Sequence, residues 1–336
     1  MSSSQYPLVS VVTPVYNEEA NIRECIESVL AQTYPNWDCA IVNNCSTDRT
    51  LEIAREYAAR DSRIRVHDNA TFVGVIENYN IAFRQTSPAS RYCKVLAADD
   101  WLYPECIERM VALAEKHPNV AMVSAFGAEG TRVAQFPLPR YSTVLPGHEV
   151  CRMRLRQGAG SGYHFGTPTL LLFRSDIVLS RHAFYNESNL HADAEACFEF
   201  LSGGDFGFVY QILTFNRLRE ESMTAVSKNL YTYYPEALYN LLKFGPLYLD
   251  EKELTYRIRE VRGAYFRFLG KQVYARRSDE FWSYHRRKLA EMGHPLTTSR
   301  IVGAAVSYTL DQLLNPKRTI EEVLRRIRAN ASGVPH

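Results

Sequence analysis

The stretch YCKVLAADDWLYP, residues 92–104, ends an apolar run in two adjacent carboxylates, Asp99 and Asp100. The run is typical of a buried strand, and Pro104 suits the first turn of a following helix. Neighbouring like charges repel one another unless a cation neutralises them. The pattern therefore indicates either a divalent-cation site or an acidic pair that caps the next helix.

The same order of strand and helix recurs through the first part of the chain. The predicted strands span residues 8–15, 37–43, 63–68 and 92–99, and the predicted helices span residues 17–35, 46–61, 75–85 and 104–117. This alternation predicts a mainly parallel α/β sheet with right-handed crossovers. Ligands of such sheets bind outside the carboxyl ends of the strands. The four loops that follow the strands, with Asp99 and Asp100 in the last of them, should therefore line one crevice.

The composition of the chain changes near residue 226. Segments up to 225 read as strands and helices of an α/β domain, whereas 226–336 is helical, aromatic and basic. From Glu251 to the end there are 17 Lys and Arg residues against 9 Asp and Glu. This excess favours contact with an anionic partner such as a membrane surface or a phosphorylated substrate, although a solvated helical face is the alternative.

Composition restricts the class of protein and its compartment. The net charge of +2 argues against a nucleic-acid partner. The 7 cysteines include no CxxC pair, which indicates a reducing compartment. The first residues lack the pattern of a signal peptide, and no apolar run approaches the roughly 18 residues of a membrane span. We expect a cytoplasmic protein and leave open a peripheral contact with the inner membrane face.

Four motifs together resemble the family 2 glycosyltransferases of the GT-A fold. They are PVYN at 14–17, NNCSTD at 43–48, the Gly74 and Asn80 pair, and the Asp pair, all within residues 7–130. The resemblance continues more weakly to about residue 225. It implies a Rossmann-like mixed, mainly parallel sheet flanked by helices, with a helical C-terminal extension. The implied domains are a glycosyltransferase domain, 1–225, with a nucleotide-binding half, 7–130, and an acceptor half, 131–225, followed by the extension, 226–336.

The implied reaction is transfer of a sugar from a nucleotide-diphosphate sugar to an acceptor hydroxyl. The acceptor would be a saccharide or a lipid-linked molecule, as in the synthesis of cell-surface polysaccharides or glycolipids. Mn²⁺ or Mg²⁺ would assist an inverting displacement. The resemblance does not specify the donor sugar, the acceptor or the linkage.

The resemblance assigns the loop after the first strand to the nucleotide. Pro14, Val15 and Tyr16 would line the pocket, with the ring of Tyr16 against the base. Stacking of this kind contributes about 1–3 kcal/mol. Glu18 lies near the same pocket, and a role as a carboxylate in the first turn of a helix is its alternative.

The resemblance also assigns residues that follow the second and fourth strands. Asn43 would read the edge of the base and Asn44 would support the ribose or the loop, while Asp99 would hold the ribose and Asp100 the metal. The family usually has Asp at the position of Asn43, and an amide accepts a hydrogen bond more weakly than a carboxylate. The family also often has Asp where this chain has Ala97.

A catalytic base must take the proton of the attacking hydroxyl. The family keeps an Asp at the start of a helix that follows the acceptor region, and Asp193 in NLHADAEACFEFL matches this position best. Glu195 is the alternative if the register slips by two residues. A helix-capping role for Asp193 is a further alternative, and His191 is expected to be a neighbour of the base.

The segment FNRLREESMT, residues 215–224, resembles the family segment that often supplies a His to the metal. Here Arg219 stands at that position. An arginine does not ligate a metal, but it binds phosphate well. We therefore expect Arg219 to clamp the diphosphate leaving group.

Other classes of protein fit the sequence less well. A nucleotidyltransferase needs a glycine-rich phosphate loop with a basic residue after the first strand, and residues 13–21 contain neither Gly nor Lys. A dinucleotide-dependent oxidoreductase would carry GxGxxG, which is absent. The departures at Asn43 and Ala97 favour one remaining alternative, a non-catalytic nucleotide-sugar-binding protein on a decayed GT-A scaffold.

Overall fold

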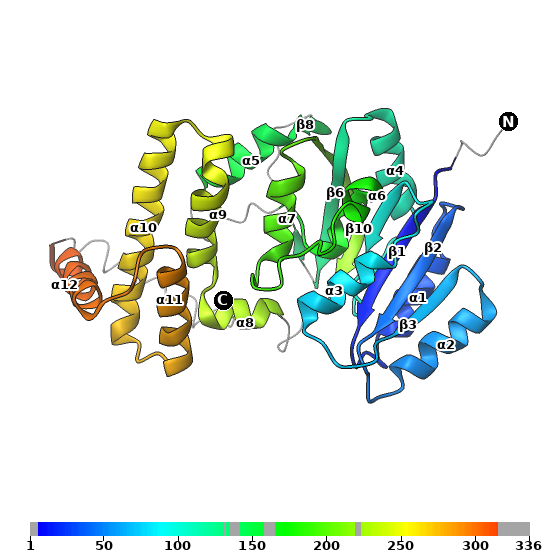
Figure 1. Cartoon of the computed structure of the whole chain (residues 1–336), viewed down its shortest axis with the longest axis horizontal. Coiled ribbons are helices and arrows are strands. Elements are labelled where there is room, and N and C mark those ends of the chain that lie inside the picture. Colours follow the sequence, from blue (N-terminus) through cyan, green and yellow to red (C-terminus); the bar gives the residue numbers. More distant parts are fainter. Residues whose placement is uncertain (1–5, 131, 135–141, 158–164, 219–222, 315–336) are drawn as a thin grey trace. The chain divides into compact units, whose positions relative to one another are not determined.

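The computed structural model describes residues 6–130, 132–134, 142–157, 165–218 and 223–314. These residues belong to two compact units that divide between Ser227 and Lys228 (Figure 1). The first unit contains the β-sheet, and the second is helical. Each unit is described by itself below.

The first four strands form the parallel half of the sheet. They are β1 (Val9–Val15), β2 (Trp37–Asn43), β3 (Ile64–Asp68) and β4 (Tyr92–Val95). They lie in the order β3-β2-β1-β4, with Val15 opposite Asn43 and Asn43 opposite Asp68. All of their carboxyl ends therefore meet at one edge, as the alternation of strand and helix predicts. The intervening helices are α1 (Ile22–Leu30), α2 (Thr50–Arg60), α3 (Val75–Arg84) and α4 (Cys106–Lys116).

The second half of the sheet is mixed. The strands are β5 (Trp101–Leu102), β6 (Val120–Glu129), β7 (Arg132–Ala134), β8 (Val144–Pro146), β9 (Leu172–Arg174) and β10 (Asp205–Asn216). Beyond β4 the order is β9-β6-β10-β5, where β9 runs antiparallel to both of its neighbours and β6 runs parallel to β10. The described part of the first unit thus forms a mixed α/β sheet with flanking helices, which confirms the predicted fold class. The remaining helical elements are α5 (Gly147–Arg156), η1 (Pro168–Leu170), α6 (Ser175–Leu179) and α7 (Ala192–Phe200).

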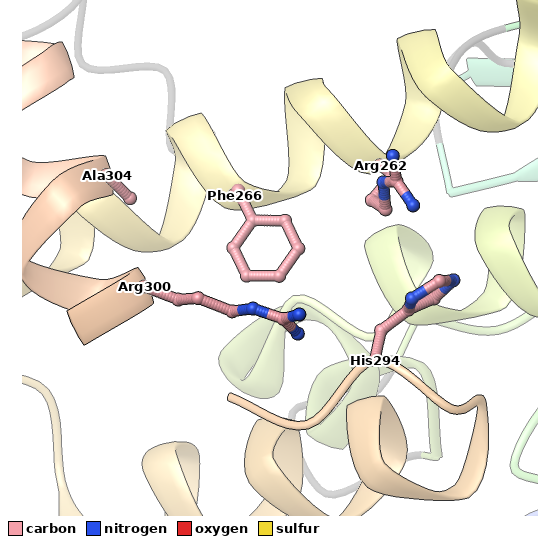
Figure 2. Close-up of a pocket in the computed structure, with 5 residues that line it drawn as sticks. All are labelled: Arg262, Phe266, His294, Arg300 and Ala304. Carbon is pink, nitrogen blue, oxygen red and sulfur yellow. The ribbon is translucent and has the colours of Figure 1, made fainter. Parts of the chain in front are cut away.

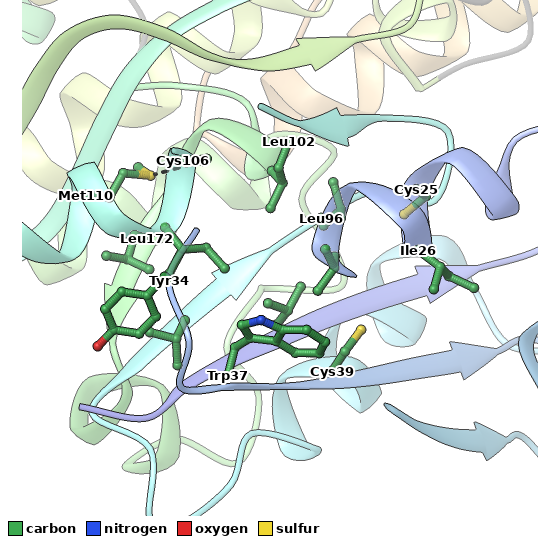
Figure 3. Packing of buried hydrophobic residues seen from close by; sticks show 14 of the residues in the cluster. Cys25, Ile26, Tyr34, Trp37, Cys39, Leu96, Leu102, Cys106, Met110 and Leu172 are labelled. Atoms are coloured by element: carbon green, nitrogen blue, oxygen red, sulfur yellow. Dashed lines mark hydrogen bonds between the residues drawn. The ribbon is translucent and has the colours of Figure 1, made fainter. Parts of the chain in front are cut away.

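Strands β1, β2 and β4 are buried almost throughout, which fits their mainly apolar sequences, whereas the edge strand β3 is largely exposed beyond Ile64. Alternate residues of β1, including Val9 and Val11, join a core cluster with residues of α1, α2 and α4. Figure 3 shows Ile26 on α1 within this cluster, beside strand β2 with Trp37 and Cys39. Helix α3 packs against β1, β2 and α6. Helix α6 in turn packs against β4 and β9.

The second unit contains amphipathic and aromatic helices. Its helices are α9 (Tyr233–Tyr248), α10 (Glu251–Tyr274), α11 (Asp279–Glu291) and α12 (Thr298–Leu314), while α8 (Met223–Leu230) contains the division between the units. Helix α10 packs against α9 and α12. Asp250 and Ser278 cap α10 and α11 by accepting backbone N–H hydrogen bonds from Glu253 and Phe281.

None of the described helices combines the length and the apolar composition that a bilayer crossing requires.

Candidate functional site

The loop after β1 is fastened to the loop after β2. Asn17 has a φ of 51°, which takes the chain out of any helix at this point. Its backbone N–H donates to Ser46 Oγ over 3.0 Å, and its Oδ1 accepts from the N–H of Thr47 over 2.8 Å. The predicted helix over 17–35 therefore begins only at Ile22, because residues 16–21 are held in a loop at the edge of the sheet.

This loop presents an aromatic side chain to solvent. Pro14 and Val15 are buried within β1, whereas Tyr16 is 43% exposed. The ring of Tyr16 lies edge-to-face against Phe72 with centroids 4.9 Å apart, and Phe72 is 60% exposed. Phe72 was not among the predicted site residues, although its loop was expected to line the crevice. The two rings form an exposed aromatic pair at the carboxyl edge of β1.

Glu18 is nearly buried beside the start of α1. Its backbone N–H donates to Thr50 Oγ1 over 2.7 Å, and its carboxylate accepts from Asn21 Nδ2 over 2.8 Å. Its carbonyl also accepts from the backbone N–H of Ile22. These contacts tie Glu18 to the first turn of α1.

Asn43 lies at the end of β2 beside a carboxylate of β3. Its Nδ2 donates to Asp68 Oδ1 over 2.8 Å, and its Oδ1 lies 3.4 Å from the backbone nitrogen of Ser46. The second oxygen of Asp68 pairs with Arg55 over 3.1 Å. Asn43 thus lies next to a carboxylate of the neighbouring strand that is itself paired with an arginine.

Asn44 connects three elements of the same edge. Its backbone N–H donates to the carbonyl of Val15 over 2.9 Å. Its side chain makes two hydrogen bonds of 2.9 Å with the backbone of Val73 and accepts a third from Asn69 over 3.2 Å. The residue holds the loop that carries Phe72 at the end of β1.

The Asp pair lies in the short segment between β4 and β5. Asp99 is half-buried, and Asp100 is only 6% exposed. Oδ2 of Asp100 accepts from Thr169 Oγ1 over 2.5 Å and from Asn216 Nδ2 over 2.9 Å, and Oδ1 accepts from the backbone N–H of Arg217 over 2.8 Å. This carboxylate is thus fixed by residues from distant parts of the sequence.

The electrostatics of Asp100 are unfavourable for an isolated carboxylate. Burial, and secondly the charge of Asp99, raise the pKa of Asp100 to about 7, although the hydrogen bonds from Thr169 and Arg217 oppose this shift. A nearby cation would relieve both effects.

The carboxylate oxygens of Asp99 and Asp100 could bind a cation if a substrate supplied the remaining oxygen ligands. The described residues contain no group of three His, Cys, Asp or Glu side chains that could hold a metal. Asp100 Oδ1 accepts one hydrogen bond, which leaves a lone pair for a metal. Mg²⁺-type ions commonly take one or two protein carboxylates and the oxygens of substrate phosphates. Asp99 and Asp100 match that set.

Asp193 lies in the first turn of α7 and faces the same region as the Asp pair. Burial, followed by the charges of Asp100, Asp99 and Asp193, raises the pKa of Tyr79 on α3. One tyrosine ring is therefore near all three carboxylates. The segment before α7 links the two helices, because Asn80 of α3 donates to the carbonyl of Tyr185 and Asn186 donates to Glu195 of α7.

Tyr185 is a second tyrosine at this place. It is 3% exposed, its ring centroid lies 5.9 Å from that of Tyr79, and its hydroxyl has no hydrogen-bond partner among the described residues. Burial, and next the charge of Asp193, raise the pKa of Tyr185. A buried hydroxyl of this kind is a donor that a bound ligand could satisfy.

Glu195, the alternative base, has a different environment. It is 2% exposed, and its carboxylate accepts from Asn186 Nδ2 over 3.1 Å and from Asn189 Nδ2 over 2.6 Å. These contacts fasten the loop that precedes α7. His191 is the N-cap residue of that helix. Asp193 is the more exposed of the two carboxylates.

The predicted phosphate clamp, Arg219, lies outside the described residues. The same segment places Arg217 beside the Asp pair, where its Nε donates to the carbonyl of Asp99 over 3.1 Å and its Nη2 pairs with Glu24 over 2.7 Å. Arg217, Thr169 and Asn216 were not among the predicted site residues. The positive charge of Arg217 could have indicated a residue near the Asp pair. A neutral Thr or Asn far from the motif in sequence gives no such indication.

The sequence model of the family described as Glycosyl transferase family 2 matches residues 10–179. The chain is 35% identical over 135 residues to the putative glycosyltransferase EpsE of Bacillus subtilis strain 168, across 38% of this chain and 48% of EpsE. The chain spans less than half the length of the first curated relatives that it matches.

Two solved structures share the fold. TarS 1–349 of S. aureus, in complex with UDP-GlcNAc, superposes with a TM-score of 0.63 at 17% identity, over 95% of this chain and 91% of TarS 1–349. The mannosyltransferase PcManGT of Pyrobaculum calidifontis, in complex with GDP-Man and Mn²⁺, gives a TM-score of 0.51 at 14% identity, over 92% of this chain and 89% of that protein. At such identities the likeness concerns the fold alone. The match across residues 10–179 establishes that this chain belongs to glycosyl transferase family 2.

Proposed function

We propose that the protein transfers a sugar from a nucleotide-diphosphate sugar to an acceptor hydroxyl by an inverting displacement. The observation that carries this proposal is the burial of Asp100 beside Asp99 after strand β4, with Asp193 close enough to act on the same tyrosine, Tyr79. Ligands of open α/β sheets bind at this edge. The three carboxylates supply the two functions that the reaction needs, a site for a cation and a base.

The nucleotide would occupy the crevice beside β1 and β2. The exposed rings of Tyr16 and Phe72 offer the base a stacking surface, and Asn43 with Asp68 behind it offers polar atoms to the base edge. Asn44 would keep the loop of Phe72 in place. UDP-GlcNAc in TarS and GDP-Man in PcManGT support a nucleotide-sugar donor, because both proteins share the fold.

Asp100, with Asp99 beside it, would hold a divalent cation together with the diphosphate of the donor. The Mn²⁺ in PcManGT supports divalent-metal use. Such a cation supplies positive charge to a departing diphosphate. Thr169, Asn216 and Arg217 would fix the orientation of the Asp100 carboxylate, and Asp99 would hold the ribose.

Asp193 would act as the base. Its carboxylate would accept the proton of the acceptor hydroxyl while the oxygen attacks the anomeric carbon of the donor sugar. Attack from the side opposite the diphosphate inverts the configuration at that carbon. The hydroxyl of Tyr185 would donate a hydrogen bond to a bound substrate near the base.

The acceptor would meet residues 131–225, with the helical region 226–336 as an extension of its site. The acceptor would be a saccharide or a lipid-linked molecule, and a lipid-linked acceptor would be met at the cytoplasmic face of the inner membrane. Helix α12 supports a peripheral membrane contact, because five of its apolar side chains are more than half exposed: Val302, Val306, Leu310, Leu313 and Leu314. The basic composition of the region after Glu251 agrees with an anionic surface.

A thermal-shift screen of nucleoside diphosphates, with and without Mn²⁺, tests the donor proposal. A ligand at 100 times its dissociation constant stabilises a protein by about 2.7 kcal/mol. We expect one nucleoside diphosphate to raise the melting temperature, and more so with Mn²⁺. Absence of any stabilisation contradicts the proposal. Stabilisation without hydrolysis or transfer of the corresponding nucleotide-sugars identifies the non-catalytic alternative.

A further inference from the structure

The second unit contains a cavity of about 390 Å³ that the proposed transfer reaction does not use. Figure 2 shows its five lining residues, which come from α10, α12 and the segment between α11 and α12. They are Arg262, Phe266, His294, Arg300 and Ala304. Two guanidinium groups, an imidazole and an aromatic ring thus border one space.

The cavity has an excess of positive charge. Among the described residues, no carboxylate lies within ion-pair distance of Arg262 or Arg300. The guanidinium group of Arg300 donates to a neutral group, the carbonyl of Pro295, over 2.9 Å. Arg257, on the same helix as Arg262, by contrast pairs with Glu260. Within the part of the chain that the structure describes, the two arginines of the cavity therefore have no carboxylate partner.

The pKa of His294 is affected by the same two positive charges. Burial, followed by the charges of Arg262 and Arg300, lowers its pKa. Both guanidinium groups are thus close enough to the imidazole to disfavour a third positive charge. A bound anion would offset their charge and remove this penalty.

We propose that this cavity binds a phosphate group. Guanidinium groups bind phosphate oxygens through charge-assisted, often bidentate hydrogen bonds, and two of them border the cavity. Phe266 and Ala304 would contact the organic part of the molecule that carries the phosphate. Either a soluble phosphorylated compound or the headgroup of an anionic phospholipid has this chemistry. The inference does not depend on the proposed transfer, because every lining residue belongs to the second unit.

Calorimetric titration of the full chain with pyrophosphate, without nucleotide or metal, tests the site. Arg262→Gln and Arg300→Gln should each weaken binding roughly tenfold or more, as expected for losing a hydrogen bond to a charged group. Arg267→Gln is the matched control, since Arg267 is an exposed arginine of the same helix that does not line the cavity. It should bind as the wild type does. In NMR titrations, pyrophosphate should raise the pKa of His294 in the wild type and in Arg267→Gln, but not in the two cavity variants.

Sedimentation with vesicles distinguishes the two sources of phosphate. Vesicles of phosphatidylcholine containing phosphatidic acid are compared with vesicles of phosphatidylcholine alone. If Arg262→Gln and Arg300→Gln lose vesicle binding and Arg267→Gln does not, the cavity binds a lipid headgroup. If the two cavity variants weaken pyrophosphate binding but not vesicle binding, the cavity binds a soluble ligand. The proposal is overturned if neither probe binds, or if the cavity variants and the control behave alike with both probes.

Discussion

Asn216 donates its side-chain amide to Oδ2 of Asp100 over 2.9 Å, across 116 residues of sequence. The contact exists because β5, which begins directly after Asp100, pairs with the end of β10, where Phe215 lies opposite Trp101. A strand pairing that looks marginal, with only two residues in β5, thereby sets the position of the proposed metal ligand. It also brings the backbone of Arg217 to the same carboxylate.

Substitution of Asp100 by Asn should abolish the Mn²⁺-dependent part of nucleoside-diphosphate binding and leave the fold intact. The amide keeps the shape of the side chain and one oxygen acceptor, but it removes the charge that a cation needs. Thermal shifts with and without Mn²⁺ measure this difference, and circular dichroism checks the fold. Undiminished Mn²⁺-dependent binding would mean that Asp100 is a structural residue that caps the turn before α4.

Thr169→Val should lower the free energy of unfolding by about 1–3 kcal/mol, because a buried carboxylate loses a hydrogen-bond donor. Valine has nearly the same shape, so the effect is not one of packing. The cost should shrink when Asp100 is already Asn, and a double-mutant cycle by urea unfolding measures this coupling. Equal costs in both backgrounds would show that Thr169 does not act through Asp100.

Asp193→Asn should reduce turnover by about 10² to 10⁴ while donor binding changes little, since an amide cannot take the proton. Steady-state kinetics with the cognate acceptor provide the measurement. Glu195→Gln is the control. It should mainly lower the melting temperature, because Glu195 accepts hydrogen bonds from Asn186 and Asn189. If Glu195→Gln is the inactive variant and Asp193→Asn is active, the base has been assigned to the wrong carboxylate.

A chain that ends at Ser227 should still bind the nucleoside diphosphate but should lose transfer to its acceptor. The proposed nucleotide residues from Pro14 to Asp100 all belong to the first unit, whereas the second begins at Lys228. Thermal shifts test nucleotide binding, and product formation tests transfer. Transfer at the full rate by a folded truncated chain would exclude a role of the second unit in the acceptor site.

The second unit should lose stability as the pH falls from about 6.5 to about 4. Burial lowers the pKa of His285 from 6.5 to about 4, and its Nε2–H donates to the carbonyl of Leu230 over 2.9 Å. The unfolded chain therefore takes up the proton first, so the stability present above the ordinary pKa is lost as the pH falls, by roughly 3 kcal/mol in all. Urea unfolding at several pH values should show a flatter profile for the non-titrating variant His285→Asn. Parallel profiles would contradict a buried neutral His285.

Features that depend on neighbouring residues in the sequence could be predicted, whereas features that depend on contacts between distant residues could not. Alternating apolar strands and amphipathic helices are local patterns, so they predicted the parallel half of the sheet. Local patterns do not divide TLLLFRSDIV, residues 169–178, because such an apolar run is typical of a single strand, yet it contains the end of η1, then β9 and α6. Ser175 leaves the strand because its N–H donates to the carbonyl of Arg91 and its hydroxyl bonds Ser90. Those partners lie more than 80 residues away in sequence.

The sequence by itself determined the family, the mixed α/β fold and the edge of the sheet at which Asp99 and Asp100 lie, because motif order and strand ends are properties of the chain alone. Only the tertiary structure decided that Asp100 is buried against Thr169 and Asn216, that Tyr16 pairs with Phe72, and that Arg262 and Arg300 border one cavity. Side-chain contacts between distant segments depend on how strands and helices pack, and packing leaves no periodic signal in the residues that make those contacts.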